Sequence, residues 1–372
     1  MYKNKKILLG YITLNSGHHR ASLAIEEALK KLSPKVETLN INAFGYTNPV
    51  LEKIINKTYM TVIKRRPEVW DYLYDNPKVL KNVQGMRDAI HKLNSKKLKN
   101  LLEDFKPDAC ACTQAFPCGM IADYKKNLNL DLPLVGVLTD NAPHSYWIFK
   151  DVDFYITPSE KSKEKFIKNG VSPDKIKPFG IPINPRFAKK NDKREICKVL
   201  GLDPDIPIIL IMGGSQGLGP VEKILNVLEY AEAPFQIIVV CGINSKLKQS
   251  LSRKSQRYKR RLCIFGLVDN VDEFMEVSDI VITKPGGLTV SEALSKDLPM
   301  IIVHPLPGQE MKNTEYLLEE GVAVKADDCE DIATLVQELS SNTAKLEEMR
   351  GAAKRLKRPN SAFDIAELLL NI

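Results

Sequence analysis

The chain has 372 residues, 44% hydrophobic and 27% charged, so it has enough apolar material for the cores of two ordinary domains. Its longest early apolar run, residues 7–14, is shorter than the about 20 residues that a bilayer-spanning helix needs, and no secretory cleavage pattern follows it. We therefore expect a cytoplasmic protein. The net charge is +8, and residues 1–185 carry the whole excess, with 29 Lys and Arg against 19 Asp and Glu. This asymmetry predicts an anionic partner, either a membrane surface or a nucleic acid, with solubility as the alternative explanation.

The first half of the chain alternates strands and helices, as a parallel α/β sheet does. Residues 20–29 have helical periodicity between the first two predicted strands. Five strands are predicted before the Gly- and Pro-containing linker at 178–185, and they cover residues 5–12, 36–41, 109–113, 134–138 and 154–157.

A helical, basic and aromatic segment interrupts this alternation at about residues 50–106. It has 13 Lys and Arg against 7 Asp and Glu, and Lys64, Arg65 and Arg66 lie close to Trp70. Cations beside aromatic side chains suit the headgroup region of an anionic membrane. The sequence thus predicts a membrane contact here, and a solvated helix pair with ordinary core aromatics is the alternative.

A second α/β unit follows the linker. Its predicted strands cover residues 208–212, 236–241, 262–265, 280–283, 300–303 and 322–325. The last predicted helix, residues 362–370, is apolar enough to pack back on the first domain. We expect domains at 1–185 and 186–355, with residues 356–372 as the returning helix.

Two glycine-rich turns follow strands of the second unit. Residues 213–219 come directly after the strand at 208–212, and residues 284–289 come after the strand at 280–283. Glycine lets a ligand approach the backbone, and a helix N-terminus offers free N–H groups, so the pair suits a phosphate; plain tight turns are the alternative. Parallel strands end at one sheet edge, so both turns are expected in one cleft.

Carboxylate and amide side chains accompany these turns. Glu292 lies in the predicted helix that follows residues 284–289, about one helical turn from its start. A carboxylate there can accept hydrogen bonds from two ribose hydroxyls. Gln309 and Glu310 follow the next strand, and their side chains suit sugar hydroxyls. The alternative is an ordinary helix start, where the helix dipole favours an acidic residue such as Glu310 without any ligand.

The string Thr283–Ala293, followed by Pro307–Glu310, resembles the donor site of the diacylglycerol glycosyltransferases, namely the monogalactosyldiacylglycerol synthases and the processive diacylglycerol glucosyltransferases. The resemblance covers about residues 7–324. It implies the GT-B fold, with two Rossmann-like, doubly wound α/β domains facing across a cleft. It also implies an inverting transfer of glucose or galactose from a UDP-sugar to a diacylglycerol-type lipid, by a protein bound peripherally at the inner face of the cell membrane.

The resemblance also implies roles for single residues. It places the diphosphate against the backbone near Gly214, Gly286 and Gly287, and the ribose on Glu292. It places the donor sugar on Gln309 and Glu310, and the uracil near Gly266, Leu267 and Val268. The predicted donor-binding residues are Gly213, Gly214, Ser215, Val268, Gly286, Gly287, Thr289, Glu292, Gln309 and Glu310.

The N-terminal half carries two further similar segments. Gly17–Ser22 is similar to the family's Gly-Gly-His-Arg-Ala-Ser, and Thr139–Trp147 is similar to its Thr-Asp…His…Trp segment. This alignment makes His19 the candidate general base, with Asp140 orienting it or acting as the base itself. The predicted acceptor-binding residues are His18, His144 and Trp147, the last two with core packing as the alternative. Which of the adjacent histidines acts is left open.

We expect no cofactor and no metal, because helix N-termini can stabilise the charge of a leaving diphosphate. We also expect no nucleic-acid partner, since the basic half lacks a nucleic-acid-binding motif. The alternatives are a transferase of the same fold with another acceptor (lipid I-like, a glycolipid or a soluble aglycone) and a UDP-sugar epimerase.

Overall fold

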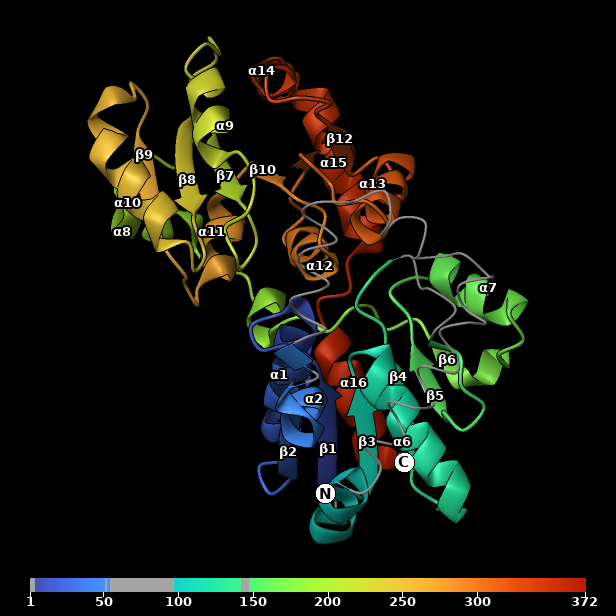
Figure 1. The fold of residues 1–372 in the computed structure, drawn as a ribbon. Coiled ribbons are helices and arrows are strands. Elements are labelled where there is room, and N and C mark those ends of the chain that lie inside the picture. Colours follow the sequence, from blue (N-terminus) through green and yellow to red (C-terminus); the bar gives the residue numbers. More distant parts are fainter. Residues whose placement is uncertain (1–3, 51, 54–96, 142–146) are drawn as a thin grey trace. The chain divides into compact units, whose positions relative to one another are not determined.

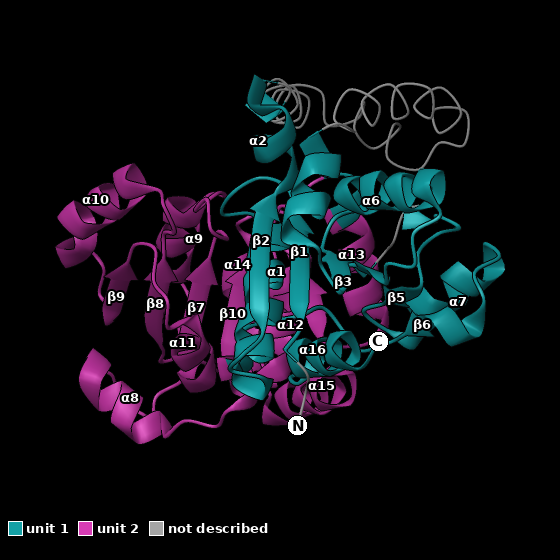
Figure 2. Cartoon of the chain, turned by 90° about the horizontal axis from the view of Figure 1, so that it is seen from below, with its two compact units in different colours: residues 1–185, 307–309, 358–372 teal, residues 186–306, 310–357 magenta. Residues whose placement is uncertain are grey.

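The structure is a computed structural model that describes residues 4–50, 52–53, 97–141 and 147–372. The chain forms two compact units (Figure 2). The N-unit consists of Met1–Pro185, Pro307–Gln309 and Arg358–Ile372, and the C-unit consists of Arg186–Leu306 and Glu310–Lys357. Five residues with predicted roles lie outside the described residues: Lys64, Arg65, Arg66, Trp70 and His144.

The N-unit is built on a six-stranded parallel sheet with the order β2-β1-β3-β4-β5-β6 (Figure 1). Its strands are β1 (Lys6–Tyr11), β2 (Glu37–Asn42), β3 (Ala109–Cys112), β4 (Leu134–Val137), β5 (Phe154–Ile156) and β6 (Ile176–Lys177). Its helices are α1 (Gly17–Leu32), α2 (Ala43–Thr47), α6 (Ala115–Leu128), α7 (Glu160–Lys168) and α16 (Ser361–Asn371), with a 3-10 turn at Pro173–Lys175.

The N-unit sheet is covered on both faces, because successive side chains of a strand point to opposite sides. In β1, Ile7 and Leu9 pack into a cluster with α1 and α16, while Leu8 packs into a second cluster with α6. The red α16 therefore lies beside the blue α1 in Figure 1, although these helices are at opposite ends of the chain. The hydroxyl of Ser361 at the start of α16 donates to the carbonyl of Ile181 over 2.7 Å, so the returning segment is also bonded to the N-unit backbone.

The C-unit repeats this design with the strand order β12-β11-β10-β7-β8-β9, again all parallel. Its strands are β7 (Ile208–Met212), β8 (Gln236–Val240), β9 (Leu262–Phe265), β10 (Ile280–Thr283), β11 (Met300–Ile302) and β12 (Ala323–Lys325). Its helices are α8 (Lys193–Leu200), α9 (Val221–Leu228), α10 (Ser245–Lys254), α11 (Val271–Val277), α12 (Gly287–Ser295), α13 (Gln309–Glu319), α14 (Asp331–Ser341) and α15 (Thr343–Leu356), and 3-10 turns occupy Pro185–Ala188 and Ser255–Arg257.

The predicted fold class, two Rossmann-like α/β units, is confirmed, and each predicted strand overlaps an observed one. The sequence reading missed β6, because two residues next to a proline-rich stretch carry no periodic pattern.

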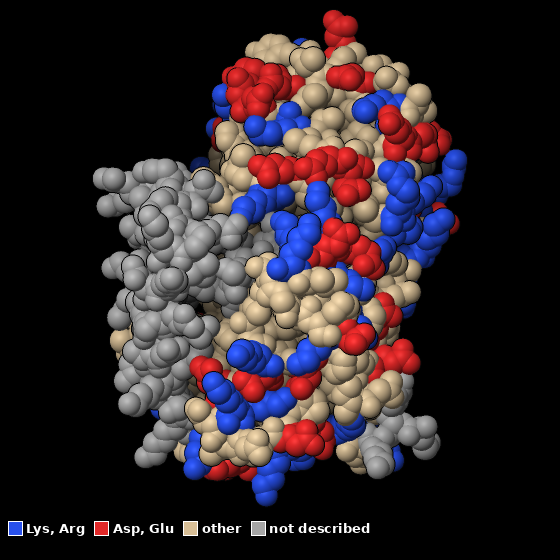
Figure 3. All heavy atoms as spheres, turned by 90° about the vertical axis from the view of Figure 1, so that its right-hand side faces the viewer, with Lys and Arg blue, Asp and Glu red and all other residues tan. Residues whose placement is uncertain are grey.

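No helix within the described residues is long and apolar enough to cross a bilayer. On the face drawn in Figure 3, Lys and Arg alternate with Asp and Glu, and neither sign covers a continuous area of the described surface.

Candidate active site

The glycine turn after β7 and the turn after β10 begin at the same level of the C-unit sheet. Thr283 of β10 pairs with Met212 of β7 in the strand register, and its hydroxyl donates to the Met212 carbonyl over 3.0 Å. Gly213 follows Met212 and Lys284 follows Thr283, and these two residues begin the glycine-rich turns. Both turns therefore leave the carboxyl edge of the sheet side by side. The structure thus places together the two turns that the sequence assigned to one site.

The glycines of the turn after β7 divide into two kinds. A methyl group on Gly213 would lie 2.3 Å from the Leu218 carbonyl oxygen, and one on Gly217 would lie 2.0 Å from the Cys241 carbonyl oxygen. These two glycines are required for close packing within the unit. A methyl group on Gly214 would meet no atom within 4 Å, so this glycine leaves open space at the turn.

The turn around Gly214 is bonded to the loop between β8 and α10. The carbonyl of Ser215 accepts a hydrogen bond from the backbone N–H of Ile243 over 2.9 Å, and the Asn244 side chain donates to the Gly217 carbonyl over 3.1 Å. The Ser215 backbone therefore has a structural role, while the open position beside it is free to accept a ligand group.

The turn after β10 leads into α12, whose N-cap is Gly286. Among the described residues, no side chain caps this helix start, and none has an atom within 4 Å of a methyl group placed on Gly286. The first N–H groups of a helix have no partner within the helix, and the dipole there favours an anion. Together with Gly214, this start offers the phosphate-binding geometry that the sequence predicts.

The side chains predicted for the donor lie around α12 and the neighbouring loops. Thr289 and Glu292 are on α12 and are partly buried, and Gly287 is its first residue. Val268 is partly buried in the loop between β9 and α11. Gln309 is the first residue of α13 and is assigned with Pro307 and Gly308 to the N-unit.

Glu310 lies in the first turn of α13 and makes two contacts within its own unit. One carboxylate oxygen lies 3.2 Å from the Nζ atom of Lys284, and the other accepts a hydrogen bond from the Leu306 backbone over 2.7 Å. Each oxygen therefore has one partner within the C-unit, and the predicted sugar contact of Glu310 stays a prediction.

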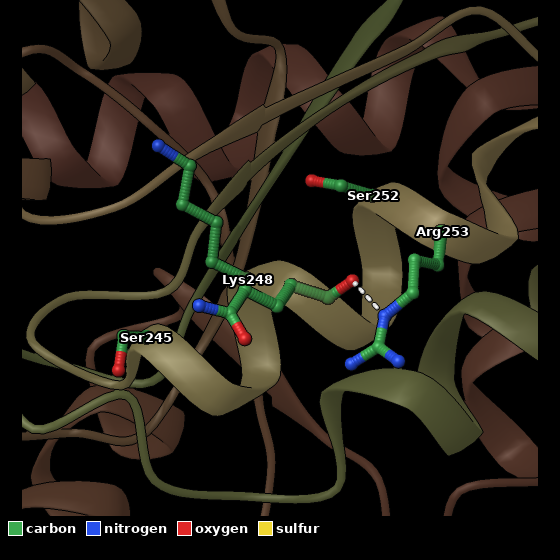
Figure 4. A pocket seen from close by; sticks show the side chains of 5 residues that line it. Ser245, Lys248, Ser252 and Arg253 are labelled. Carbon is green, nitrogen blue, oxygen red and sulfur yellow. Dashed lines mark hydrogen bonds between the residues drawn. The ribbon is translucent and has the colours of Figure 1, made fainter.

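A hollow of about 500 Å³ runs along α10 and is lined by Ser245, Lys248, Gln249, Ser252 and Arg253 (Figure 4). All five lining residues belong to α10 (Ser245–Lys254), whose N-cap Asn244 is the residue bonded to the turn after β7. Lys248 lies beside Gly266 in the loop predicted to hold the uracil, because a methyl group on Gly266 would lie 3.5 Å from the Lys248 Cδ atom. Its aliphatic chain therefore backs the loop that carries Val268.

In the N-unit, His18 is fixed at the carboxyl edge of the sheet. Its Nδ1 atom lies 2.9 Å from the Thr113 carbonyl oxygen and 2.9 Å from the Thr139 hydroxyl. The Thr113 hydroxyl donates back to the His18 carbonyl over 2.9 Å. A ring nitrogen next to a carbonyl oxygen must carry the proton, so the neutral ring has its lone pair on Nε2.

Burial lowers the pKa of His18 below its ordinary value, and the hydrogen bond to Thr113 partly opposes this effect. The ring is therefore neutral near pH 7, with a basic Nε2. The Thr139 hydroxyl also lies 3.4 Å from a carboxylate oxygen of Asp140, which joins this carboxylate to the same group. This arrangement suits a general base.

His19 has the opposite tautomer. Its Nδ1 accepts a hydrogen bond from the Asn15 backbone over 3.2 Å, so the neutral ring carries its proton on Nε2. The ring stacks on Tyr11 with the centroids 4.3 Å apart, and burial is the main cause that lowers its pKa. The two adjacent histidines thus have opposite tautomers, with the lone pair on Nε2 in His18 and on Nδ1 in His19.

Trp147 is a predicted acceptor-binding residue, with core packing as the alternative. It is only 5% exposed and packs in the N-unit core with residues of β3, β4 and α6. The alternative of core packing is therefore correct for Trp147. The sequence reading also missed Thr113 and Thr139, although each follows a buried strand at the same sheet edge, and this position was the available signal.

Comparisons with known proteins match both parts of the chain. Residues 18–183 match the family of monogalactosyldiacylglycerol (MGDG) synthase, and residues 208–368 match the C-terminal domain of glycosyltransferase family 28. A processive diacylglycerol beta-glucosyltransferase of Bacillus licheniformis is 30% identical over 97% of this chain and 94% of its own length. The protein of the same name from Bacillus subtilis is 29% identical, over 100% and 96%.

Solved structures share the fold. MurG of Acinetobacter baumannii has a TM-score of 0.61 at 16% identity, covering 99% of this chain and 100% of that chain. The UDP-GlcNAc 2-epimerase of Neisseria meningitidis, bound to UDP-GlcNAc, has a TM-score of 0.63 at 14% identity, with the same coverage. These likenesses show the GT-B fold, and the full-length relatives show the family. The chain therefore belongs to the diacylglycerol glycosyltransferase family and is a glycosyltransferase.

Proposed function

We propose that the protein transfers a hexose from a UDP-sugar to a diacylglycerol-type lipid, with inversion at the anomeric carbon. The observation that carries this proposal is the pair of glycine turns that start level at one sheet edge, each with an open glycine, Gly214 and Gly286. The names of the full-length relatives support the lipid acceptor and make glucose the first hexose to test.

The donor is held mainly by the backbone. The N–H groups at the start of α12 and the open turn at Gly214 bind the diphosphate, and Glu292 accepts hydrogen bonds from the ribose hydroxyls. The same N–H groups stabilise the charge that grows on the diphosphate as it leaves, so the transfer requires no metal. We therefore expect the turnover rate to be the same with and without EDTA, which removes divalent metal ions.

His18 activates the acceptor. Its Nε2 removes the proton of the lipid hydroxyl while the hydroxyl oxygen bonds to the anomeric carbon and the bond from that carbon to UDP breaks. A single displacement of this kind inverts the anomeric centre. Thr113 and Thr139 hold the tautomer that the step requires, and Asp140 favours the imidazolium that results.

The acceptor is embedded in a bilayer, so we propose peripheral binding at the inner face of the cell membrane. The basic and aromatic segment at about residues 50–106 supports this, although Lys64, Arg65 and Arg66 lie outside the described residues. The wild type should co-sediment with anionic vesicles and be released by salt. Reversal of all three charges to Glu should reduce sedimentation and spare UDP binding; equal sedimentation with neutral vesicles contradicts this contact.

The decisive experiment incubates the protein with diacylglycerol in micelles and, separately, UDP-glucose, UDP-galactose and UDP-N-acetylglucosamine, with the lipid product identified by mass. A hexosyl-diacylglycerol is the expected product. Conversion of a UDP-sugar without any acceptor would instead identify an epimerase, and a glycosylated product only with another lipid or a soluble alcohol would change the acceptor class.

A further inference from the structure

The part of the C-unit between β8 and β9 carries a local concentration of positive charge. Residues 245–261, which we call the α10 segment, contain eight Lys and Arg and no Asp or Glu. Residues 186–372 contain 25 Lys and Arg against 27 Asp and Glu, so without the α10 segment they have 17 against 27. The segment forms α10 and the 3-10 turn Ser255–Arg257, beside the edge strand β9 (Figure 1). A basic surface thus lies in an otherwise acidic part of the chain.

The eight cations divide into two that hold the segment in place and six that face solvent. Lys254 forms an ion pair with Glu222 of α9. The Arg260 guanidinium lies 3.7 Å from the centroid of the Phe235 ring and donates to three carbonyls at and just after the end of α9. The other six are exposed and have no ion pair among the described residues: Lys246, Lys248, Arg253, Arg257, Lys259 and Arg261. Their positive potential is therefore available to an anionic partner.

The outer side of α10 is hollowed and lined by hydrogen-bond donors. Leu247 and Leu251 pack into the C-unit core. The opposite side of the helix, with residues three and four apart, lines the hollow of about 500 Å³ with two cations, two hydroxyls and one amide (Figure 4). Arg253 bends back along this side, where its Nε atom donates to the Gln249 carbonyl over 3.3 Å. Such a set of donors suits the oxygens of a phosphate group.

Exposed apolar side chains lie next to the α10 segment. Tyr230 is 84% exposed, and the carboxylate of its neighbour Glu229 accepts from the Lys259 N–H over 3.0 Å. Ile243 is 48% exposed and stands two residues before the start of α10. Aromatic and aliphatic side chains beside cations suit the headgroup region of an anionic membrane, where the rings enter the interface and the charges meet phosphates.

We propose that the α10 segment is a docking surface for anionic lipid headgroups, so that the C-unit contacts the membrane through its own residues. The phosphate groups of the lipids bind along the hollow between Lys248 and Arg253. Charge complementarity and the exposed Tyr230 and Ile243 favour a lipid surface over a nucleic acid. The inference rests on the proposed function in one respect, the bilayer-embedded acceptor, and it involves no residue of the basic segment at about 50–106.

A neutralised pair tests this surface in the full chain. Arg253→Gln combined with Arg257→Gln removes two exposed cations and retains Lys254 and Arg260, which hold the segment. Each cation near an anionic surface contributes a factor of roughly five to binding, so the pair should weaken binding to mixed phosphatidylglycerol and phosphatidylcholine vesicles roughly thirtyfold. Sedimentation over a series of lipid concentrations measures the binding constant.

Lys190→Gln combined with Lys354→Gln is the matched control. Both lysines are exposed in the C-unit outside the α10 segment, and the net charge changes equally. Charges away from the contact are screened by salt, so the control should bind vesicles within about twofold of the wild type. The unfolding temperature, the Kd of UDP and the turnover of diacylglycerol in neutral micelles should be the same in all three proteins.

The other outcomes overturn the proposal. Equal vesicle binding by the wild type and the Arg253 and Arg257 pair would exclude this surface, and an equal loss in both pairs would show an effect of net charge alone. Weaker binding to duplex DNA with unchanged vesicle binding would make the partner a nucleic acid. Sedimentation uses neither donor nor acceptor, so a wild-type protein that binds vesicles but glycosylates no diacylglycerol contradicts only the proposed function.

Discussion

The carboxyl edges of the two sheets offer different kinds of chemistry. At the N-unit edge, a side chain is fixed: His18 is held by Thr113 and Thr139 in a single tautomer. At the C-unit edge, the backbone is exposed, with open space at Gly214 and Gly286 beside a helix start. The difference fits the two proposed tasks, because a proton acceptor requires one oriented lone pair, whereas a diphosphate is bound well by several N–H groups and a helix dipole.

The largest effect should come from the N-unit edge. His18→Ala should lower kcat by roughly 10²–10⁴-fold, because the acceptor hydroxyl loses its base. His19→Ala is the matched control and should lower kcat far less, since its Nε2 carries a proton. Steady-state kinetics at saturating UDP-glucose checks this, and calorimetry should show unchanged UDP binding in both variants. The reverse order of the two losses would return the role of base to His19.

A smaller effect is expected from a side chain at the C-unit edge. Glu292→Ala should raise KM for the UDP-sugar roughly 10–100-fold, because hydrogen bonds to a charged acceptor contribute about 1.5–3 kcal/mol. The variant should unfold at the wild-type temperature. If calorimetry finds the affinity for UDP unchanged, Glu292 does not hold the ribose.

The two kinds of glycine allow a paired test of the backbone site. Gly286 has φ −65° and room for a methyl group, so Gly286→Ala should fold normally and raise KM for the donor about tenfold, by blocking one phosphate contact. Gly217→Ala should instead destabilise the protein by more than about 2 kcal/mol, since φ is 59° and the methyl group would meet the Cys241 carbonyl. Denaturant unfolding and donor KM distinguish the two. Normal donor binding by Gly286→Ala would place the diphosphate elsewhere.

The smallest effect concerns the tautomer of His18. Thr139→Val removes one neutral hydrogen bond of about 1 kcal/mol and should lower kcat about fivefold, with UDP binding retained.

The pH dependence of the reaction should follow the protonation of His18. The base must be neutral, and burial lowers the pKa of His18, so kcat/KM should fall with decreasing pH only below the ordinary histidine value of about 6.5. An acid limb centred above pH 6.5 would mean that a different group titrates.

The sequence predicted the architecture well because strand periodicity and helical periodicity are local properties. Each predicted strand is present, and the glycine turns follow β7 and β10 as expected. Local patterns were less reliable for side chains. Trp147 and Glu310 stand in segments similar to the family motifs, yet one packs in the core and the other is engaged by Lys284 and Leu306.

The sequence by itself determined two parallel α/β units, the order of the glycine turns and the family, since these depend on residue types at fixed spacing along the chain. Only the tertiary structure decided which of two adjacent histidines has its lone pair on Nε2, and which glycines have room for a methyl group among the described residues. Those properties depend on atoms that are distant in sequence, such as the Thr113 carbonyl 95 residues from His18. A hydrogen bond or a steric contact forms between neighbours in space, and the folded chain alone defines those neighbours.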